Sequence, residues 1–344
     1  MTPKALKSLI APFQAAAANG AAPDVQAALD AVMSPDAVVH LCHPFGDVTG
    51  PAGLWAAALE PLFEGLSDVE RREMIVLAGT TPEGQDWIGC CGNYMGTFVR
   101  PFLDIPPTGH LVHMRYHEFF RVENGQIVEM QAIWDLPELM MQAGAWPLAP
   151  QLGAYLCTPA PMTQDGITAE GDGQATMDHV LAMLTAMVRH PSQGGPEVME
   201  LERYWHPRFN WYGPAGIGTS RGNSGFRNWH QIPFLRAMPD RALDPSGLIS
   251  HWVAEGAYVC ETGWPNMRQT LSGGGWLGMP ATGKTVLLRS LDFWRMEAGL
   301  IRENWVLVDL LDAMAQQGLD ALARMREVNT ARPGYDPETG KALT

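Results

Sequence analysis

Four carboxylates lie at two equivalent pairs of positions in this chain, each beside a stretch rich in apolar residues. Glu118 and Asp135 flank the segment "FFRVENGQIVEMQAIW", and Asp292 and Asp309 flank the segment "FWRMEAGLIRENWVLV". A carboxylate removed from water must be paired or protonated, and burial raises its pKa. A raised pKa suits a carboxyl group to general acid–base catalysis near neutral pH. The first hypothesis for these four residues is therefore proton transfer.

Each of these carboxylates also has a structural interpretation. Asp135 and Asp309 come where a predicted strand meets a predicted helix, so either residue could simply cap that helix. For the other two acids, the alternative is a salt bridge to a neighbouring arginine such as Arg115 or Arg289. The catalytic and the structural interpretations both stay open at this point.

The orientation of the last strand in each half decides which residues face a pocket. Side chains two positions apart share a face of a strand. Asp309 therefore shares a face with Trp305 and Leu307, whereas Trp134 of the first half lies on the alternate face with Ala132. The alternation does not tell which of the two faces is turned inward.

Histidines and aromatic residues are the next candidates, for substrate binding. Histidine is suited to proton transfer near pH 7, and aromatic rings can line a pocket for a flat or cyclic ligand. The alternatives are a structural hydrogen-bonded histidine and an aromatic core. The candidates of the first half are His43, His117 and Trp134. The candidates of the second half are Trp211, Tyr212, His230, His251, Trp264 and Trp305.

These positions are equivalent because the chain contains an internal duplication. "FLDIPPTGH" (102–110) is repeated as "WLGMPATGK" (276–284), and the residues that follow match without a gap. Upstream, the match continues at a slightly smaller offset. Matched pairs include Phe119 with Phe293, Arg121 with Arg295, Gly125 with Gly299, Pro35 with Pro207, and Gly50 with Gly222. A repeat this long indicates two whole domains and not a solenoid.

The pattern of elements is the same in both halves. Apolar residues at helical spacing predict helices over 4–19 and 24–33, and again over 176–189 and 196–205. A strand, a third helix, two hairpins and a short closing helix follow in each half. In the turn "ENG", Asn and Gly suit positions that need positive φ. Helices first and antiparallel strands later indicate an α+β domain.

Composition bounds the class of protein. The 344 residues suit two domains of about 150 residues each. A net charge of -14 argues against partners that need basic patches, namely nucleic acid and anionic membranes. Five cysteines without ligand-like spacing favour a reduced, cytoplasmic protein, and no run is long enough to span a membrane. No cluster predicts a metal site.

The closing hairpin of each half resembles a known family. "PATGK", a strand containing Asp-x-x-Arg, Gly-x-Ile, and a strand ending in Asp resemble the SnoaL-like polyketide cyclase family of the nuclear-transport-factor-2-like superfamily. The second half fits better, with "MPATGK", "SLDFWR", "GLIRENWVLVD" and "RAMPDR", whereas the first half has Glu118 where the family usually has Asp. The resemblance implies a cone in which a strongly curved antiparallel sheet wraps round three or four helices and leaves a deep pocket.

This resemblance and the repeat together predict the domain organisation. We expect one domain over 1–146, a linker rich in Pro, Gly and Thr over 147–175, a second domain over 176–326, and a polar tail over 327–344. Many proteins of this fold are homodimers, so we expect the two domains to pair as an intramolecular pseudo-dimer. Further homodimerisation stays open.

The resemblance also implies a function. We expect a cofactor-independent enzyme that acts on a small carbonyl compound by aldol-type cyclisation, isomerisation or dehydration. Asp309 would accept or donate the proton, and Asp292 would stabilise an enolate or orient the substrate. The hairpin also resembles that of ketosteroid isomerase, in which an acid at the position of Glu118 or Asp292 stays protonated in an apolar site. The alternatives are a non-catalytic small-molecule-binding protein and an interaction scaffold.

Overall fold

The computed structural model describes residues 1–329 together with 334, 336, 339 and 341. Most of the predicted polar tail therefore lies outside the described residues. The chain forms two compact units, one made of residues 1–147 and 320–344 and the other of residues 148–319. Of the helices in the described part of the chain, none is long and apolar enough to cross a membrane.

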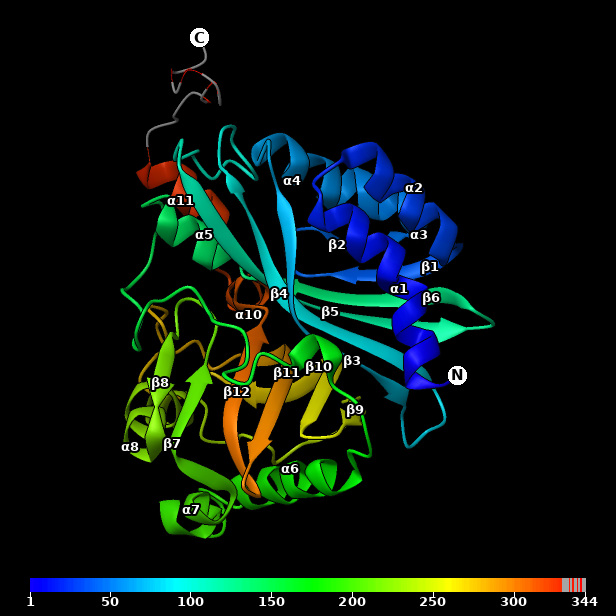
Figure 1. Ribbon diagram of the computed structural model, residues 1–344. Coiled ribbons are helices and arrows are strands. Elements are labelled where there is room, and N and C mark those ends of the chain that lie inside the picture. The colour runs from blue at the N-terminus through cyan, green and yellow to red at the C-terminus, as the bar shows by residue number, and fades with distance from the viewer. Residues whose placement is uncertain (330–333, 335, 337–338, 340, 342–344) are drawn as a thin grey trace. The chain divides into compact units, whose positions relative to one another are not determined.

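The first unit is one six-stranded sheet with helices (Figure 1). Its helices are α1 (Pro3–Ala18), α2 (Ala22–Val32), α3 (Gly50–Leu54), α4 (Glu60–Gly65), α5 (Leu136–Gln142) and α11 (Ala321–Val328). Its strands are β1 (Met33–Leu41), β2 (Gly46–Thr49), β3 (Glu70–Thr80), β4 (Asp86–Thr97), β5 (Leu111–Glu123) and β6 (Gln126–Trp134). The strand order is β2-β1-β6-β5-β4-β3, and β1 and β6 run parallel in an otherwise antiparallel sheet.

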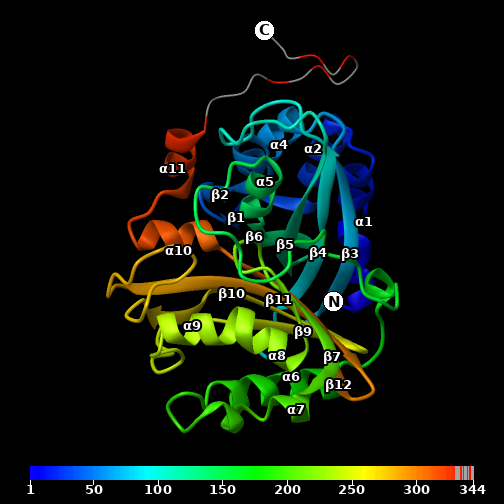
Figure 2. The same cartoon turned by 90° about the vertical axis from the view of Figure 1, so that its left-hand side faces the viewer.

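The second unit repeats this architecture, with α6, α8 and α9 beside its sheet (Figure 2). Its helices are α6 (Gln174–Met187), α7 (Leu201–Tyr204), α8 (Gly222–Phe226), α9 (Ile232–Ala237) and α10 (Leu310–Gln316). Its strands are β7 (Trp205–Tyr212), β8 (Thr219–Arg221), β9 (His251–Glu255), β10 (Tyr258–Thr270), β11 (Thr285–Glu297) and β12 (Leu300–Val308). The order β8-β7-β12-β11-β10-β9 matches the first sheet strand for strand.

The predicted α+β class and the duplication are confirmed by these two repeated units. The short strands β2 and β8 were not expected from the sequence. Each is only a few residues long and pairs with the end of the preceding strand, so it carries little periodic signal of its own. The third helix of each unit contains a π-helical turn, Trp55–Leu59 in the first and Arg227–Gln231 in the second.

The repeated motif at 102–110 and 276–284 builds the same tight turn twice. Phe102 and Ile105 exchange backbone hydrogen bonds, as do Trp276 and Met279. The two central residues of each turn have positive φ: Leu103 and Asp104 in the first, and Leu277 and Gly278 in the second. This left-handed geometry is that of the mirror-image turns that close hairpins.

The matched glycines Gly50 and Gly222 lie where another stretch of backbone passes too close to leave room for a side chain. Gly50 and Gly222 have φ of 64° and 62°, respectively. A Cβ atom on Gly50 would lie 2.2 Å from the carbonyl oxygen of Pro35, and one on Gly222 would lie 3.0 Å from that of Pro207. Both copies therefore keep glycine where the start of the third helix passes close to the first strand.

Candidate functional site

A cavity of about 130 Å³ lies inside the second unit, between its helices and the inner face of its sheet. Most of the lining is apolar and aromatic, including Met183, Met187, Phe226, Phe234 and Trp276. The polar residues of the lining are His230, Gln231, Arg241, Ser290, Asp292 and Asn304. A mostly apolar cavity with a few convergent polar groups is the usual form of a small-molecule site.

Strand alternation places one face of β11 and β12 in this cavity. Alternate residues line it: Ser290, Asp292 and Trp294 on β11, and Asn304, Val306 and Val308 on β12. Asp292 accepts a hydrogen bond of 2.8 Å from the Ser290 hydroxyl. The predicted candidate Asp292 is therefore a cavity residue, and the inner face of the last strand is the one that carries Val306 and Val308.

A second acid, Glu261 on β10, lies directly across the ladder from Asp292. Opposite residues of an antiparallel pair have side chains roughly 5 Å apart on the same face. Glu261 is 8% exposed, and its Oε1 accepts hydrogen bonds from the Ser250 hydroxyl (2.5 Å) and the Asn266 amide (3.2 Å). Burial raises the pKa of Glu261 to about 6 although both hydrogen bonds lower it. Asp292 was identified as a candidate from the sequence, but Glu261 was not identified as its neighbour.

His230 projects from the π-helical turn before α9 into the cavity. Its ring stacks on Trp211 at 4.1 Å between centroids and packs against Phe234. Burial and, second, the charge of Arg241 lower the pKa of His230 to about 3. Its Nδ1 atom is buried without a hydrogen-bond partner among the described residues. The imidazole is therefore neutral near pH 7, and Trp211 and His230 are two predicted binding residues that the cavity brings together.

Arg241 comes from the segment between α9 and β9 and ends the stretch "RAMPDR", which belongs to the family resemblance of the second half but was given no role in the predicted site. Its neighbour Asp240 holds this segment to β10 by accepting a 2.8 Å hydrogen bond from the backbone N–H of Thr270. Burial lowers the pKa of Arg241 to about 10. Within the described part of the chain, no carboxylate forms an ion pair with its guanidinium. The cavity therefore contains a cation that its own walls do not neutralise.

Asp309 lies outside the cavity, at the end of β12. Its carboxylate accepts a 3.1 Å hydrogen bond from the backbone N–H of Asp312 and thereby caps α10. It also forms an ion pair of 3.2 Å with Arg289. This is the capping interpretation, so we do not retain Asp309 as the proton-transfer residue. Arg289, expected as a partner of Asp292, pairs with Asp309 instead.

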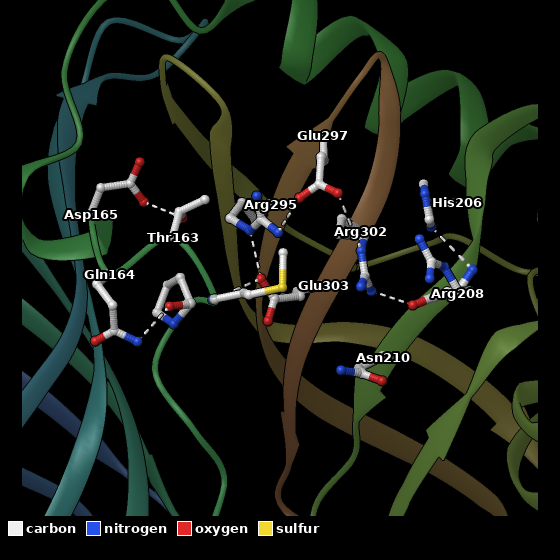
Figure 3. A network of polar contacts seen from close by, with 12 residues as sticks. Thr163, Gln164, Asp165, His206, Arg208, Asn210, Arg295, Glu297, Arg302 and Glu303 are labelled. Carbon is white, nitrogen blue, oxygen red and sulfur yellow. Dashed lines mark hydrogen bonds and ion pairs between the residues drawn. The ribbon is translucent and has the colours of Figure 1, made fainter.

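Two further candidates, Trp305 and Tyr212, lie on the opposite face of the same sheet from the cavity. The Trp305 indole donates to the carbonyl oxygen of Pro159, and the Tyr212 hydroxyl donates to Glu303 at 3.3 Å. Glu303 also forms a 2.5 Å ion pair with Arg295 in the polar network of Figure 3. This face is covered by a segment of the unit's own chain.

That segment is the part of the predicted linker around Thr163. The backbone N–H of Met162 donates to Glu303 at 3.2 Å, and the Thr163 hydroxyl donates to Asp165 (Figure 3). The Tyr258 hydroxyl also donates to Asp165, and this bond holds the segment to β10. Trp305 and Tyr212 therefore make structural contacts on the opposite face of the sheet and do not line the cavity.

His251 and Trp264 are the remaining candidates of the second unit. His251 begins β9, and its Cα partner is Thr262 on β10. Trp264 precedes Pro265, and the guanidinium of Arg289 lies 4.5 Å from the centre of its ring. Neither His251 nor Trp264 is among the described residues that line the cavity.

In the first unit, the acid at the matched position is packed against buried side chains. Glu118 is fully buried and pairs with Arg71 of β3 at 2.5 Å. It also accepts hydrogen bonds from the Tyr94 hydroxyl at 3.1 Å and the Trp134 indole at 2.8 Å. Burial acts to lower the pKa of Arg71, but Glu118 and other neighbours raise it well above its ordinary value. The salt-bridge alternative therefore applies to Glu118, with Arg71 as its partner instead of Arg115.

The other predicted residues of the first unit have structural positions. Asp135 accepts from the backbone N–H of Glu138 at 3.2 Å, caps α5, and lies 3.5 Å from Arg115. His117 is buried on the face of β5 opposite Glu118, and His43 follows β1 at a partly exposed position before Pro44. These residues do not converge with Glu118.

No group of three or more His, Cys, Asp and Glu side chains is arranged to hold a metal ion among the described residues. The five cysteines, all within the described range 1–329, form no disulfide, and four of them are buried. The candidate site is therefore described by its carboxyl groups, imidazole, guanidinium and aromatic walls.

Comparison with known proteins assigns the family. The profile of the SnoaL-like polyketide cyclase family matches the chain twice, over residues 10–143 and 192–317. The chain therefore belongs to the SnoaL-like polyketide cyclase family and contains two tandem copies of its domain. No match was found among curated proteins.

Several solved structures are similar to parts of this chain. One is a protein of Jannaschia sp. CCS1 assigned to the SnoaL-like polyketide cyclases, with 23% identity over 40% of this chain and 91% of that chain and a TM-score of 0.35. IdmH of Streptomyces antibioticus has 24% identity over 40% and 96% of the two chains, with a TM-score of 0.34. AclR of Streptomyces galilaeus has 19% identity over 42% and 98%, with a TM-score of 0.35.

Proposed function

We propose that this protein is a cofactor-independent enzyme that uses the cavity of its second unit for acid–base catalysis on a small carbonyl compound. The observation that carries the proposal is the position of Asp292, a carboxyl group in an aromatic cavity, directly opposite the buried Glu261. Family membership supports the class of reaction, which is aldol-type cyclisation, isomerisation or dehydration.

In this proposal Asp292 is the base that removes a proton from the carbon next to the substrate carbonyl. The electrons of the broken C–H bond form an enolate. In an isomerisation, the proton returns to another carbon. In a cyclisation, the enolate carbon attacks a second carbonyl carbon of the same molecule, and the alkoxide that forms takes the proton from Asp292. Positioned proton transfer of this kind contributes about 10²- to 10⁴-fold to the rate.

Glu261 and His230 support this step. Burial raises the pKa of Glu261 to about 6, so this carboxyl group can take up and release a proton close to neutral pH beside Asp292. His230 is neutral and can donate one N–H to the oxygen on which negative charge develops. Trp211 keeps its ring in place by stacking.

The size of the cavity supports a small substrate. A cavity of about 150 Å³ holds a molecule such as benzene, and the present cavity is about 130 Å³. We therefore expect a compound with a single ring or a short chain.

Exchange of α-protons in heavy water tests the proposal without knowledge of the natural substrate. A stable cyclic keto acid, 4-oxocyclohexanecarboxylate, is incubated with the protein, and the loss of its α-proton NMR signals is followed. We expect catalysed exchange by the wild-type protein and a loss of about 10²-fold or more in Asp292→Asn.

The matched control is Asp309→Asn, because asparagine also caps helices and the cavity is unchanged. It should exchange at the wild-type rate. If Asp292→Asn binds the keto acid and exchanges it as fast as wild type, Asp292 is not the base. If neither protein exchanges a bound keto acid, the cavity binds ligand without chemistry, which is the alternative function.

A further inference from the structure

We propose that the substrate of this site is an anion whose carboxylate is bound by Arg241. The inference rests on the proposed function for the location of the site, but it concerns recognition and not the proton-transfer step. Arg241 lines the same cavity as Asp292 and comes from a different element, the segment that joins α9 to β9.

The side chain of Arg241 is half-buried, and its charge has no ion-pair partner among the described residues. A guanidinium removed from water destabilises the fold unless a counter-charge or hydrogen-bond acceptors replace the water. The first unit meets this requirement internally, since Arg71 pairs with Glu118 and Glu73. In the second unit, the part of the chain that the structure describes supplies no ion pair to Arg241. A ligand anion is the group that would complete the site.

The cavity also contains hydrogen-bond donors without acceptors. His230 lies close enough for the guanidinium charge to lower its pKa. The residues Trp205 and Trp294 line the same cavity, and their indole nitrogens have no acceptor among the described residues. A cavity that contains a cation together with donor groups that lack acceptors favours an oxygen-rich anionic ligand.

Asp292 imposes the opposite requirement on the ligand. A carboxylate placed beside Asp292 and Glu261 would be repelled, so the ligand must present its neutral carbonyl part there and its anionic end to Arg241. Cavity size limits the remainder to a single ring or a short chain. The substrate class is therefore a small keto acid.

The guanidinium fork binds two oxygens of a carboxylate or of a phosphate alike, so size decides between them, and the carboxylate is the smaller group. The small cavity also leaves little room for a tetrahedral group beside a ring. Inorganic phosphate nevertheless serves as the second arm of the test, because both anions present the same charge-assisted contacts.

The test is binding measured by calorimetry with the full chain. The probes are 4-oxocyclohexanecarboxylate, its uncharged carboxamide and inorganic phosphate. A hydrogen-bonded charge contact corresponds to roughly ten- to a hundredfold in affinity. We expect the carboxylate to bind at least tenfold more tightly than the carboxamide and more tightly than phosphate. We expect Arg241→Met to remove this preference and Arg241→Lys to retain part of it.

Arg236→Met is the matched control, because Arg236 lies on α9 a few residues away and is exposed. It should bind all three probes as wild type does. Equal affinity for carboxylate and carboxamide, an unchanged preference in Arg241→Met, or tighter binding of phosphate would overturn the proposal. Melting curves of each variant establish that it is folded.

Failure of the proposed function gives a different pattern. If the keto acid binds with the charge preference but exchanges no α-protons, the recognition by Arg241 stands and the catalytic role of Asp292 does not. If both the keto acid and the carboxamide exchange at equal rates and bind equally, the catalytic role stands and the recognition does not.

Discussion

The two units place an acid at the same point of the same sheet and surround it differently. In the first unit, Glu118 is neutralised by Arg71 and held by Tyr94 and Trp134. In the second unit, Asp292 lines a cavity with its neighbour Ser290. The first acid is paired within its own unit, whereas the second faces a cavity.

Side-chain volume differs at one matched pair of positions. Tyr116 pairs with Trp134 across β5 and β6, and at the same place in the second unit Ser290 pairs with Val308. Two large aromatic residues are thus replaced by two small ones, and both small residues line the cavity. A duplicated fold can therefore keep one copy as a packed structural unit while the other keeps the site.

The largest expected effect is on the internal ion pair of the first unit. Arg71→Met leaves Glu118 buried without a counter-charge, which costs about 3–5 kcal/mol of unfolding free energy. The double variant Arg71→Met/Glu118→Gln should recover most of this loss, because it removes the buried charge. Urea unfolding measures the free energy of unfolding of the single and the double variant. Arg241→Met should lose little stability in the absence of ligand, and equal losses at Arg71 and Arg241 would contradict the comparison.

The next largest effect is a loss of stability at acid pH that is caused by His230. Its pKa is lowered in the folded protein, so the unfolded chain binds the proton more readily, and stability falls as the pH drops from about 6.5 toward 3. At pH 5 this amounts to at most about 2 kcal/mol. His230→Gln should remove that part of the pH dependence. Unfolding at pH 7.5 and 5 checks it, and an unchanged pH dependence would show that His230 is not held neutral by burial.

For Glu261, the pH dependence of stability has the opposite sign. Its pKa is raised in the folded protein, so ionisation destabilises the fold progressively between about pH 4.5 and 6. Glu261→Gln keeps an oxygen for Ser250 and Asn266 and should stabilise the protein at pH 7.5 by about 1–2 kcal/mol. Below pH 4.5 the gain should vanish. A gain that does not depend on pH would reject the buried-charge explanation.

The smallest expected effect tests what the units share. Asp135 and Asp309 cap equivalent helices, so Asp135→Ala and Asp309→Ala should each cost about 1 kcal/mol. Thermal unfolding of the two variants measures the cost. A large loss at one position alone would show that its ion pair with Arg115 or Arg289 outweighs the cap.

Much of the fold could be predicted from the sequence, because the duplication is written in matched residues. Gly125 and Gly299, for example, have the same φ of 78° in the closing hairpins. The ends of β6 and β12 could not be oriented in this way, because alternation groups residues by face without telling which face the helices cover. Trp305 and Asp309 were therefore expected in the pocket although they lie away from it.

Glu261 was not identified, and Arg241, although part of "RAMPDR", was given no role in the site; both residues lie where the two copies differ. The register of β10 shifts between Gly263 and Met267, so matching the halves residue by residue did not place Glu261 opposite Asp292. Arg241 belongs to a longer connection than its counterpart between α4 and β3. An acidic residue inside "YVCETGW" was the one available signal for Glu261.

The most direct measurement is a proton–nitrogen NMR spectrum of the tryptophan indoles while 4-oxocyclohexanecarboxylate is added. Trp205 and Trp294 line the cavity of the second unit, whereas the indole of Trp134 is bonded to Glu118 in the first. We predict that the Trp205 and Trp294 signals shift on binding and that the Trp134 signal stays in place. A shift of Trp134 with Trp205 and Trp294 unchanged would contradict the assignment of the site to the second unit.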